Sequence, residues 1–152
     1  MQSSIKSGMH KRVFFDTSVI IAALLSRSGA SYCILSELSD DFEFVINEYV
    51  FEEVRRSIER KFKKEPGLLS NLFSVIALSG MVTLRNPDKK EVRDAEQLIS
   101  KKDASILASA LIESDYLLTL DNEFFKPSIV AAAHKRHLLI LKPGDFIHLF
   151  DR

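Results

Sequence analysis

The chain has 152 residues, of which 46% are hydrophobic, 9% aromatic and 28% charged. This composition excludes a disordered, collagen-like or low-complexity protein, and a chain of this length can bury a core of its own. Lysine plus arginine and aspartate plus glutamate each number 21, so the zero net charge provides no overall field that would attract nucleic acid.

Short apolar strands alternate with longer segments of helical spacing. In chain order, we expect a strand at 12–16, helices at 18–25 and 30–38, a strand at 42–46, helices at 48–64 and 68–77, a strand at 81–84, helices at 91–100 and 103–113, strands at 116–120 and 138–141, and a helix at 145–150. Asn47 is the expected N-cap of the longest helix. This alternation predicts an α/β fold, a three-layer α/β/α arrangement with a central parallel sheet of about five strands.

No membrane span or export signal is expected. The longest aliphatic run, residues 19–25, is far short of the roughly 18 apolar residues that a span requires, and the first residues lack the apolar core of a signal peptide. We expect residues 1–11 to be a flexible lead-in and residues 12–152 to form a single domain. The single cysteine, Cys33, excludes an internal disulfide framework and favours a cytoplasmic location.

Three aspartates stand at or near the starts of predicted helices, on their apolar faces. After Asp16 and after Asp103, aliphatic or alanine residues follow at the third, fourth, seventh and eighth positions, and Asp121 directly follows a strand. Each aspartate alone is equally well explained as a helix N-cap. Because parallel strands end at one edge of the sheet, Asp16 and Asp121 are expected to converge there. Converging carboxylates repel one another, and a divalent cation relieves that repulsion.

A fourth acid is expected from the helix at 48–64, which carries Glu52 and Glu53. Helical periodicity does not choose between them, because the apolar stripe lies almost midway between the two. For either residue alone, a solvated helix face is the simpler interpretation, with Glu52 paired to Arg55 or Arg56. A site built only from carboxylate oxygens favours Mg²⁺ or Mn²⁺ over zinc.

Four segments resemble, in order, the motifs of PIN-domain proteins. They are Val-Phe-Phe-Asp-Thr-Ser-Val from residue 13, Tyr-Val-Phe-Glu-Glu-Val from 49, Asp-Ala-Ser-Ile-Leu-Ala-Ser-Ala from 103 and Tyr-Leu-Leu-Thr-Leu-Asp from 116. The resemblance covers residues 12–150 and implies a PIN-like fold. By motif match it implies an acidic quartet of catalytic and metal-binding residues: Asp16, Glu53, Asp103 and Asp121.

The resemblance also bears on residues around the quartet. Glu53 matches better than Glu52 because it directly precedes an aliphatic residue. Ser18 and Thr119 match positions that support the acids. Glu123 stands where many relatives have an aspartate, and it is either a further metal ligand or a cap of the short helix that follows.

The resemblance implies a metal-dependent endoribonuclease that hydrolyses RNA phosphodiester bonds with a metal-activated water. One or two Mg²⁺ or Mn²⁺ ions would be bound, and the substrate would be RNA, in single-stranded form. Similar proteins are toxins of bacterial toxin–antitoxin pairs, which implies an antitoxin protein as partner. The apolar faces of residues 30–38 and 50–62 are candidates for a homodimer interface. Lys101 and Lys102 directly precede Asp103 and are candidates for contacting RNA phosphates.

Two other classes of function remain as alternatives. The first is a catalytically weak PIN-like module that binds nucleic acid or protein. The second is a phosphatase or phosphoacceptor α/β domain, since Asp16 also ends a strand. A haloacid-dehalogenase-like phosphatase would need an aspartate where Ser18 stands, and a dinucleotide-binding domain would need a glycine-rich turn after the first strand.

Overall fold

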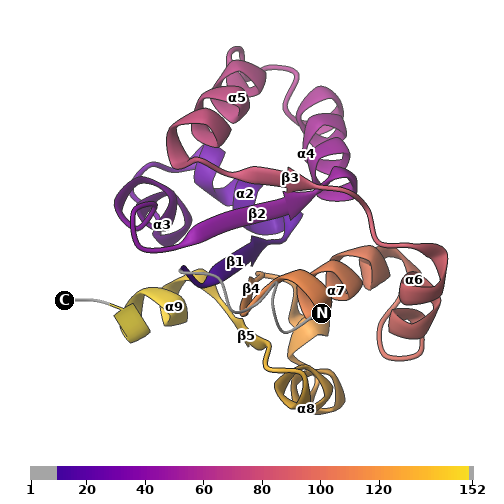
Figure 1. Ribbon diagram of the computed structural model, residues 1–152. Helices are drawn as coiled ribbons and strands as arrows, with labels where there is room; N and C mark the ends of the chain where they lie inside the picture. Colours follow the sequence, from indigo (N-terminus) through magenta and orange to yellow (C-terminus); the bar gives the residue numbers. More distant parts are fainter. Residues whose placement is uncertain (1–9, 151–152) are drawn as a thin grey trace.

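Five parallel strands form the centre of the molecule, in the order β3–β2–β1–β4–β5 (Figure 1). The computed structural model describes residues 10–150, and its strands are β1 (Arg12–Phe15), β2 (Glu43–Asn47), β3 (Val82–Leu84), β4 (Tyr116–Leu118) and β5 (Leu139–Leu141). β1 lies in the middle and pairs with β2 and β4. The predicted central parallel sheet is confirmed. The predicted lead-in at 1–11 lies outside the described residues except for its last two.

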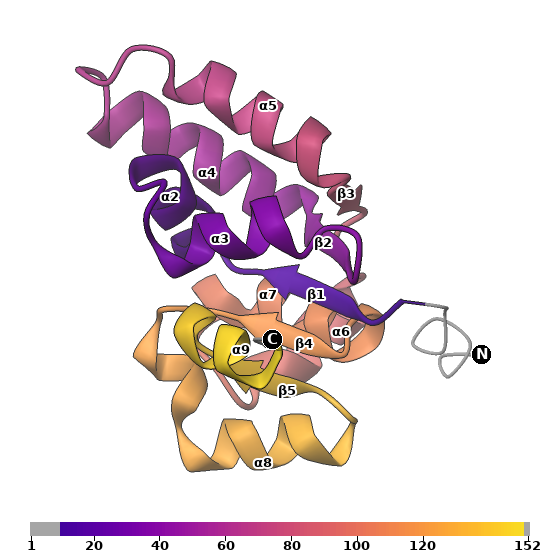
Figure 2. The same ribbon diagram turned by 90° about the vertical axis from the view of Figure 1, so that its left-hand side faces the viewer.

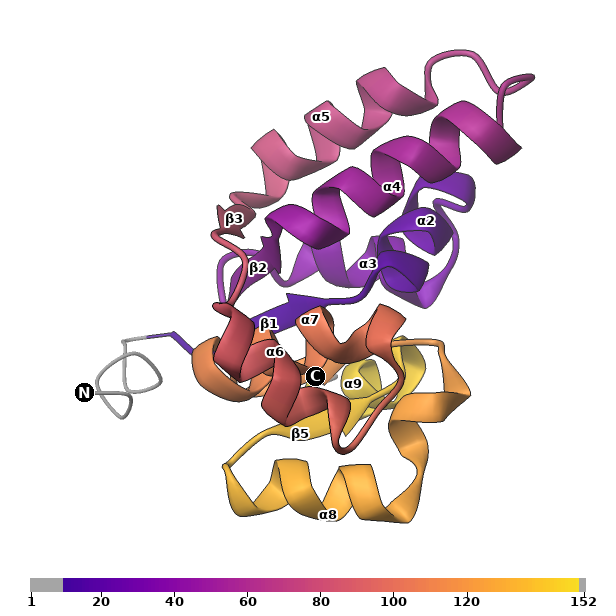
Figure 3. The ribbon, with the colours of Figure 1, turned by 90° about the vertical axis from the view of Figure 1, so that its right-hand side faces the viewer.

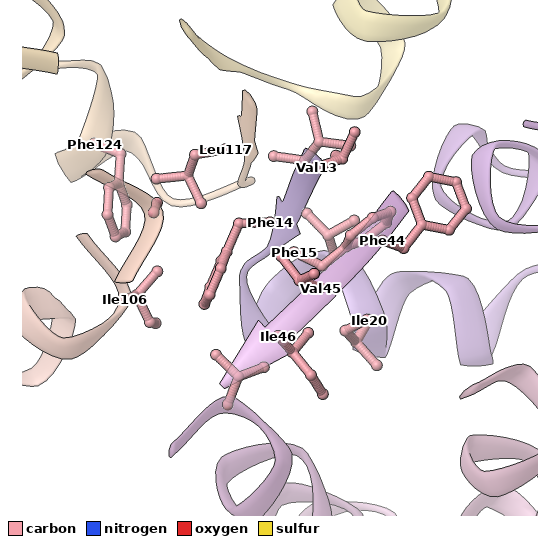
Figure 4. Close-up of a cluster of buried hydrophobic side chains, with 14 of the residues drawn as sticks. Val13, Phe14, Phe15, Ile20, Phe44, Val45, Ile46, Ile106, Leu117 and Phe124 are labelled. Carbon is pink, nitrogen blue, oxygen red and sulfur yellow. The ribbon is translucent and has the colours of Figure 1, made fainter. Parts of the chain in front are cut away.

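The strands are continuous apolar runs because both faces of the sheet are covered. Phe14 and Phe15 of β1 are fully buried and point to opposite faces, as neighbours on a strand do. Figure 4 shows Phe14 on the side of Ile106 and Phe15 on the side of Phe44. The rings of Phe15 and Phe44 pack edge to face with centroids 5.2 Å apart. Packing on both faces therefore fixes the position of β1, whose end leads into the candidate site.

Helices complete the three predicted layers. They are α2 (Thr17–Leu25), α3 (Ala30–Glu37), α4 (Glu48–Lys61), α5 (Leu68–Ser79), α6 (Lys89–Glu96), α7 (Lys101–Glu113), α8 (Pro127–Lys135), α9 (Pro143–Phe150) and the short 3₁₀ helix η1 (Asn122–Phe125). In Figure 1, α3 and α9 lie on one side of the sheet, and α6 and α7 lie on the other. Figure 3 shows α4 and α5 side by side at the β3 end of the sheet, with α8 at the β5 end.

Several predicted helix boundaries were wrong, and capping residues explain most of the differences. α6 begins at Lys89 instead of 91, because Asp88 and Glu91 form a capping box, and it ends at Glu96. α7 begins at Lys101, after Ser100 as N-cap, so Asp103 is the third residue of the helix. α4 ends at Lys61 and not at 64, since the backbone of Phe62 leaves the helical region. The Asn47 N-cap is confirmed by its Oδ1, which accepts from the Val50 N–H at 2.9 Å.

The segment between β4 and β5 departs most from the predictions. No element was predicted at residues 127–135, where α8 forms with Pro127 as its first residue. Proline is favoured at that position because it has no N–H that needs a partner. β4 ends at Leu118, two residues earlier than predicted, so residues 119–121 form a loop at the edge of the sheet.

No single helix among the described residues is long and apolar enough to cross a membrane. Only α2 and α3 taken together have the length and apolar composition of a span, and the chain bends by 91° between them.

Candidate active site

The four predicted acids line one hollow at the edge of the sheet where the strands end. This acidic hollow has a volume of about 440 Å³. Asp16 follows β1, Glu53 comes from α4, Asp103 from α7, and Asp121 from the loop after β4. The other residues that line it are Thr17, Ser18, Ile21, Ser57, Lys61, Phe62 and Lys102. Side chains from four separate elements therefore meet in one place.

Asp16 is held by three hydrogen bonds although its side chain is almost fully buried, with the residue 4% exposed. Its Oδ1 accepts from the Thr17 N–H at 2.7 Å, and its Oδ2 accepts from Ser18 Oγ at 3.1 Å and from Thr119 Oγ1 at 2.6 Å. Burial raises the pKa of Asp16 above its usual value, and these hydrogen bonds oppose that shift. Asp16 thus caps α2, as the capping interpretation expects, and it also lines the acidic hollow.

Ser18 and Thr119 connect Asp16 to the loop that carries Asp121. The Thr119 hydroxyl donates to Asp16 and accepts from the Asp121 N–H at 3.0 Å. The Ser18 hydroxyl donates to Asp16 and accepts from the Leu120 N–H at 3.1 Å. Two hydroxyl groups therefore fix the position of this loop against the start of α2.

Glu53 faces the acidic hollow, whereas Glu52 faces away from it. Thr17 Oγ1 donates to Glu53 Oε1, and the Tyr49 hydroxyl lies 3.4 Å from Glu53 Oε2. Glu52 forms a two-point ion pair with Arg55 on the outer side of α4, and the hydrogen bond from Arg55 lowers the pKa of Glu52. The orientation of α4 therefore places Glu53, and not Glu52, at the hollow. Helical periodicity alone does not distinguish the two glutamates.

Glu123 joins Asp103 and Asp121 in the most crowded part of the site. One carboxylate oxygen from each of these three residues lies within 4.8 Å of the others. Burial and the neighbouring acids Glu123 and Asp121 raise the pKa of Asp103 to about 8. The pKa of Glu123 is lowered, chiefly by a hydrogen bond with Asp103 and then by Ser100. Without a cation, burial and the neighbouring carboxylates therefore favour the protonated form of Asp103.

The suggested role of Glu123 as a cap of the following short helix was wrong. Asp121 caps η1, because its Oδ1 accepts from the Glu123 N–H at 3.0 Å. The Glu123 carboxylate instead accepts from Ser100, at 2.8 Å from its hydroxyl and 3.2 Å from its N–H. Glu123 therefore links the start of α7 to the loop after β4.

Sequence reasoning missed three residues that hold the acids. Thr17 bonds Glu53, Ser100 bonds Glu123, and the Tyr49 hydroxyl donates to the Lys102 carbonyl at 2.9 Å beside Glu53. Burial raises the pKa of Tyr49, and the nearby Glu53 and Asp103 add to the shift. Local signals exist, since Thr17 separates Asp16 from Ser18 and Tyr49 stands one helical turn before Glu53. Spacing alone does not reveal the contact partners.

The basic residues at the acidic hollow differ in part from those predicted. Lys102 lines it, as does Lys61 from the end of α4. Lys101 is exposed and is not among the described residues that form the lining. Two lysines from different helices, Lys61 and Lys102, therefore lie beside the acids.

Comparisons with known proteins give a family model and two similar folds. The PIN-domain family model matches residues 13–130. A chain in the crystal structure of VapBC2 from Rickettsia felis, bound to a DNA fragment from their promoter, is 17% identical with a TM-score of 0.67, over 86% of this chain and 98% of that chain. PAE2754 from Pyrobaculum aerophilum is 16% identical with a TM-score of 0.66, over 95% and 98% respectively. At these identities the likeness shows the fold. No curated protein matches the chain significantly.

Proposed function

The chain belongs to the PIN-domain family, and from that premise we propose that it is a metal-dependent endoribonuclease that cleaves single-stranded RNA. PIN domains are generally nucleases, so hydrolysis of a nucleic-acid backbone is the coarse activity that the family gives. The observation that carries the proposal is the convergence of the four acids on one hollow, with Glu123 beside them.

The donor set fits a divalent cation of the Mg²⁺ or Mn²⁺ type. Carboxylates and hydroxyls supply the oxygen atoms around the acidic hollow, and neither histidine nor cysteine is among the described residues that line it. Burial and, after it, the neighbouring acids raise the pKa of Asp103, and a bound cation would favour its charged form. We assign the binding of one or two ions to Asp16, Glu53, Asp103 and Asp121, with Glu123 as a further candidate ligand.

The remaining residues would prepare the site for a phosphodiester. When bound, Mg²⁺ or Mn²⁺ makes water a usable nucleophile and neutralises charge that develops on the phosphate. Ser18 and Thr119 hold Asp16 in one orientation, and Thr17 does the same for Glu53. Lys61 and Lys102 bring positive charge to an otherwise acidic site, where an RNA phosphate would approach.

The test is cleavage of single-stranded RNA by the purified protein with Mn²⁺, with Mg²⁺ or with a chelator. We expect cleavage only with an added ion, and a loss of at least about 100-fold in Asp16→Asn and Asp103→Asn. Asp94→Asn is the matched control, because Asp94 is exposed on α6 and pairs with Lys90.

Cleavage that survives the chelator, or equal activity in Asp16→Asn and Asp94→Asn, would contradict the proposal. Tight RNA binding without any cleavage would instead support the alternative of a binding module.

The likeness to a chain of VapBC2 supports a toxin role with an antitoxin protein as partner. A homodimer is a further proposal, and we assign it to the surface between α3 and α5. Leu78 of α5 is 86% exposed and lines a hollow of about 190 Å³ together with Tyr32 and Leu35 of α3. Leu78→Lys should convert a dimer to a monomer in light scattering, and an unchanged dimer would place the interface elsewhere.

A further inference from the structure

A second hollow lies beside the acidic hollow at the same edge of the sheet. Its volume is about 370 Å³, and α2, α3, α9 and Leu120 contribute to it. α2 contributes Ser18 and Ile21 to the acidic hollow, and Ala22, one residue further along, to the second. Leu120, which is 44% exposed, directly precedes Asp121. An extended strand that enters the acidic hollow would therefore reach the second hollow by crossing Leu120.

Two helices begin at the second hollow, and both are eight residues long. α3 starts after Gly29 without a side-chain cap, so its first N–H groups have no partner within the helix. α9 starts directly after Lys142, whose exposed ammonium group lies 5.7 Å from the centre of the Phe125 ring. Figure 2 shows α3 and α9 as neighbours. Helix N-termini and a lysine favour a phosphate group.

Ser31 gives independent evidence that this hollow takes a ligand. The residue lines the hollow and is only 5% exposed. Its hydroxyl forms no hydrogen bond with any residue that the structure describes. Among the described residues, only Ser114 Oγ is a side-chain polar atom that is both sealed from solvent and without a hydrogen-bond partner. The Ser31 oxygen is therefore not sealed, and it is open to the hollow that the residue lines. The Ser31 hydroxyl is therefore free to form a hydrogen bond with a ligand that occupies the hollow.

The remaining lining favours a ligand larger than a bare anion. Most of the surface is apolar, and Ala22, Leu120 and Pro143 are among the apolar residues that line it. Asp145 of α9, the one acid in the lining, would repel a free phosphate. A carboxylate accepts hydrogen bonds from the N–H groups of a nucleobase, and apolar side chains pack against its ring.

We propose that the second hollow binds the nucleotide next to the cleaved bond of the RNA substrate. Its base would lie against Leu120 and Ala22, and its phosphate would meet Lys142 and the first N–H groups of α3. The Ser31 hydroxyl would gain its missing partner from the same nucleotide. This inference rests on the proposed function, because it assigns the hollow to the RNA strand that is cut.

The test is a titration of the ¹⁵N-labelled full chain with each nucleoside 5′-monophosphate and, separately, with inorganic phosphate. We expect the amide signals of Ala30, Ser31 and Gly144 to shift with the nucleotides and much less with phosphate. A Gly144→Leu variant should reduce the shifts, because Gly144 lines the hollow and a side chain added there meets no atom within 4 Å, so it adds bulk without disturbing the fold. Ala131→Leu, at an exposed position on α8, is the matched control.

Binding of a short labelled single-stranded RNA extends the test to the substrate. Lys142→Gln should weaken binding several-fold and reduce the slope of log affinity against log salt by about 0.7, as one lost phosphate contact on a single strand would. Lys135→Gln, at the end of α8, should leave both values unchanged.

Two results would overturn the inference. One is the absence of amide shifts with the nucleotides, and the other is an equal response to inorganic phosphate, which would mean a simple anion site. Neither result depends on cleavage. Nucleotide binding in a protein that cuts no RNA would therefore refute the proposed function and leave the hollow as a nucleotide site.

Discussion

The Asp16 carboxylate accepts hydrogen bonds from Thr17, Ser18 and Thr119 while it is buried beside other acids. At the residue scale, the acids are therefore held in place by neutral hydroxyl and N–H donors. Lys61 and Lys102 line the same hollow but form no ion pair with the acids among the described residues. Such an arrangement leaves the negative charge of the site uncompensated and available for a cation.

Asp16→Asn should leave the metal-free protein as stable as the wild type or more stable. Asparagine is as good an N-cap as aspartate, and the neutral amide avoids the burial of a charge. Asp16→Ala should lose about 1–2 kcal/mol, because it removes the cap and the partner of Thr119. Thermal melting in chelator would measure both variants. If the asparagine variant is as destabilised as the alanine variant, the charge of Asp16 itself stabilises the fold.

The stability of the metal-free protein should fall as the pH rises from about 4 to about 8. The pKa of Asp103 is about 8 in the folded protein and near 3.8 when unfolded, so the folded state binds more protons in this range. Urea unfolding at several pH values in chelator would measure the slope. Asp103→Asn should have a flatter slope than the wild type, and identical slopes would show that Asp103 titrates normally. Added Mn²⁺ should reverse the trend, because an ion binds the deprotonated carboxylates.

At the scale of elements, Asn47 joins the end of β2 and the start of α4 to α7. Its side chain is fully buried, caps α4 through Val50, and donates to Ser109 Oγ at 2.8 Å and to the Ser105 carbonyl at 3.2 Å. This contact sets the position of α4, which carries Glu53, relative to α7, which carries Asp103. The distance between two of the site's acids therefore depends on one amide.

Asn47→Ala should destabilise the protein by about 2–4 kcal/mol, which is the sum of a lost helix cap and lost buried hydrogen bonds. Ser109→Ala removes only one of these bonds and should cost about 1 kcal/mol. Urea denaturation would measure both changes. A loss in Asn47→Ala no larger than that in Ser109→Ala would contradict the linking role of Asn47.

Elements with strong local signals could be predicted from the sequence. β1 is an unbroken apolar run and was predicted to within one residue. Asn47 precedes a helix with regular apolar spacing, so the start of α4 was predicted correctly, although its end was placed three residues too late. The start of α7 was placed two residues late, because Asp103 was the more prominent capping residue although Ser100 occupies the cap. α8 was missed because its signal, Pro127, follows directly on η1 without an intervening apolar pattern.

Contacts between distant elements lie beyond sequence reasoning. Parallel topology alone predicts that Asp16 and Asp121 approach one another. The bonds from Ser100 to Glu123 and from Tyr49 to Lys102 depend on how α7 and α4 are rotated, which local spacing does not determine. For the same reason, the structure and not the periodicity distinguishes Glu53 from Glu52.

At the scale of the whole molecule, acids from four elements meet at one edge of the sheet, although the chain as a whole has zero net charge. Because four of the acidic residues lie in the hollow, basic residues outnumber acidic ones in the rest of the chain. A polyanion can therefore approach although the total charge is zero. We therefore propose that the acids bind a shared divalent cation and that RNA cleavage depends on this ion.

Thermal melting at neutral pH with and without millimolar Mn²⁺ would show whether the acids bind a cation. An ion that binds only the folded state raises the melting temperature, and a concentration of 100 times the dissociation constant adds about 2.7 kcal/mol. We predict a clear rise in the wild type and in Asp94→Asn, and none in Asp103→Asn. No rise in the wild type, or an equal rise in Asp103→Asn, would contradict the claim.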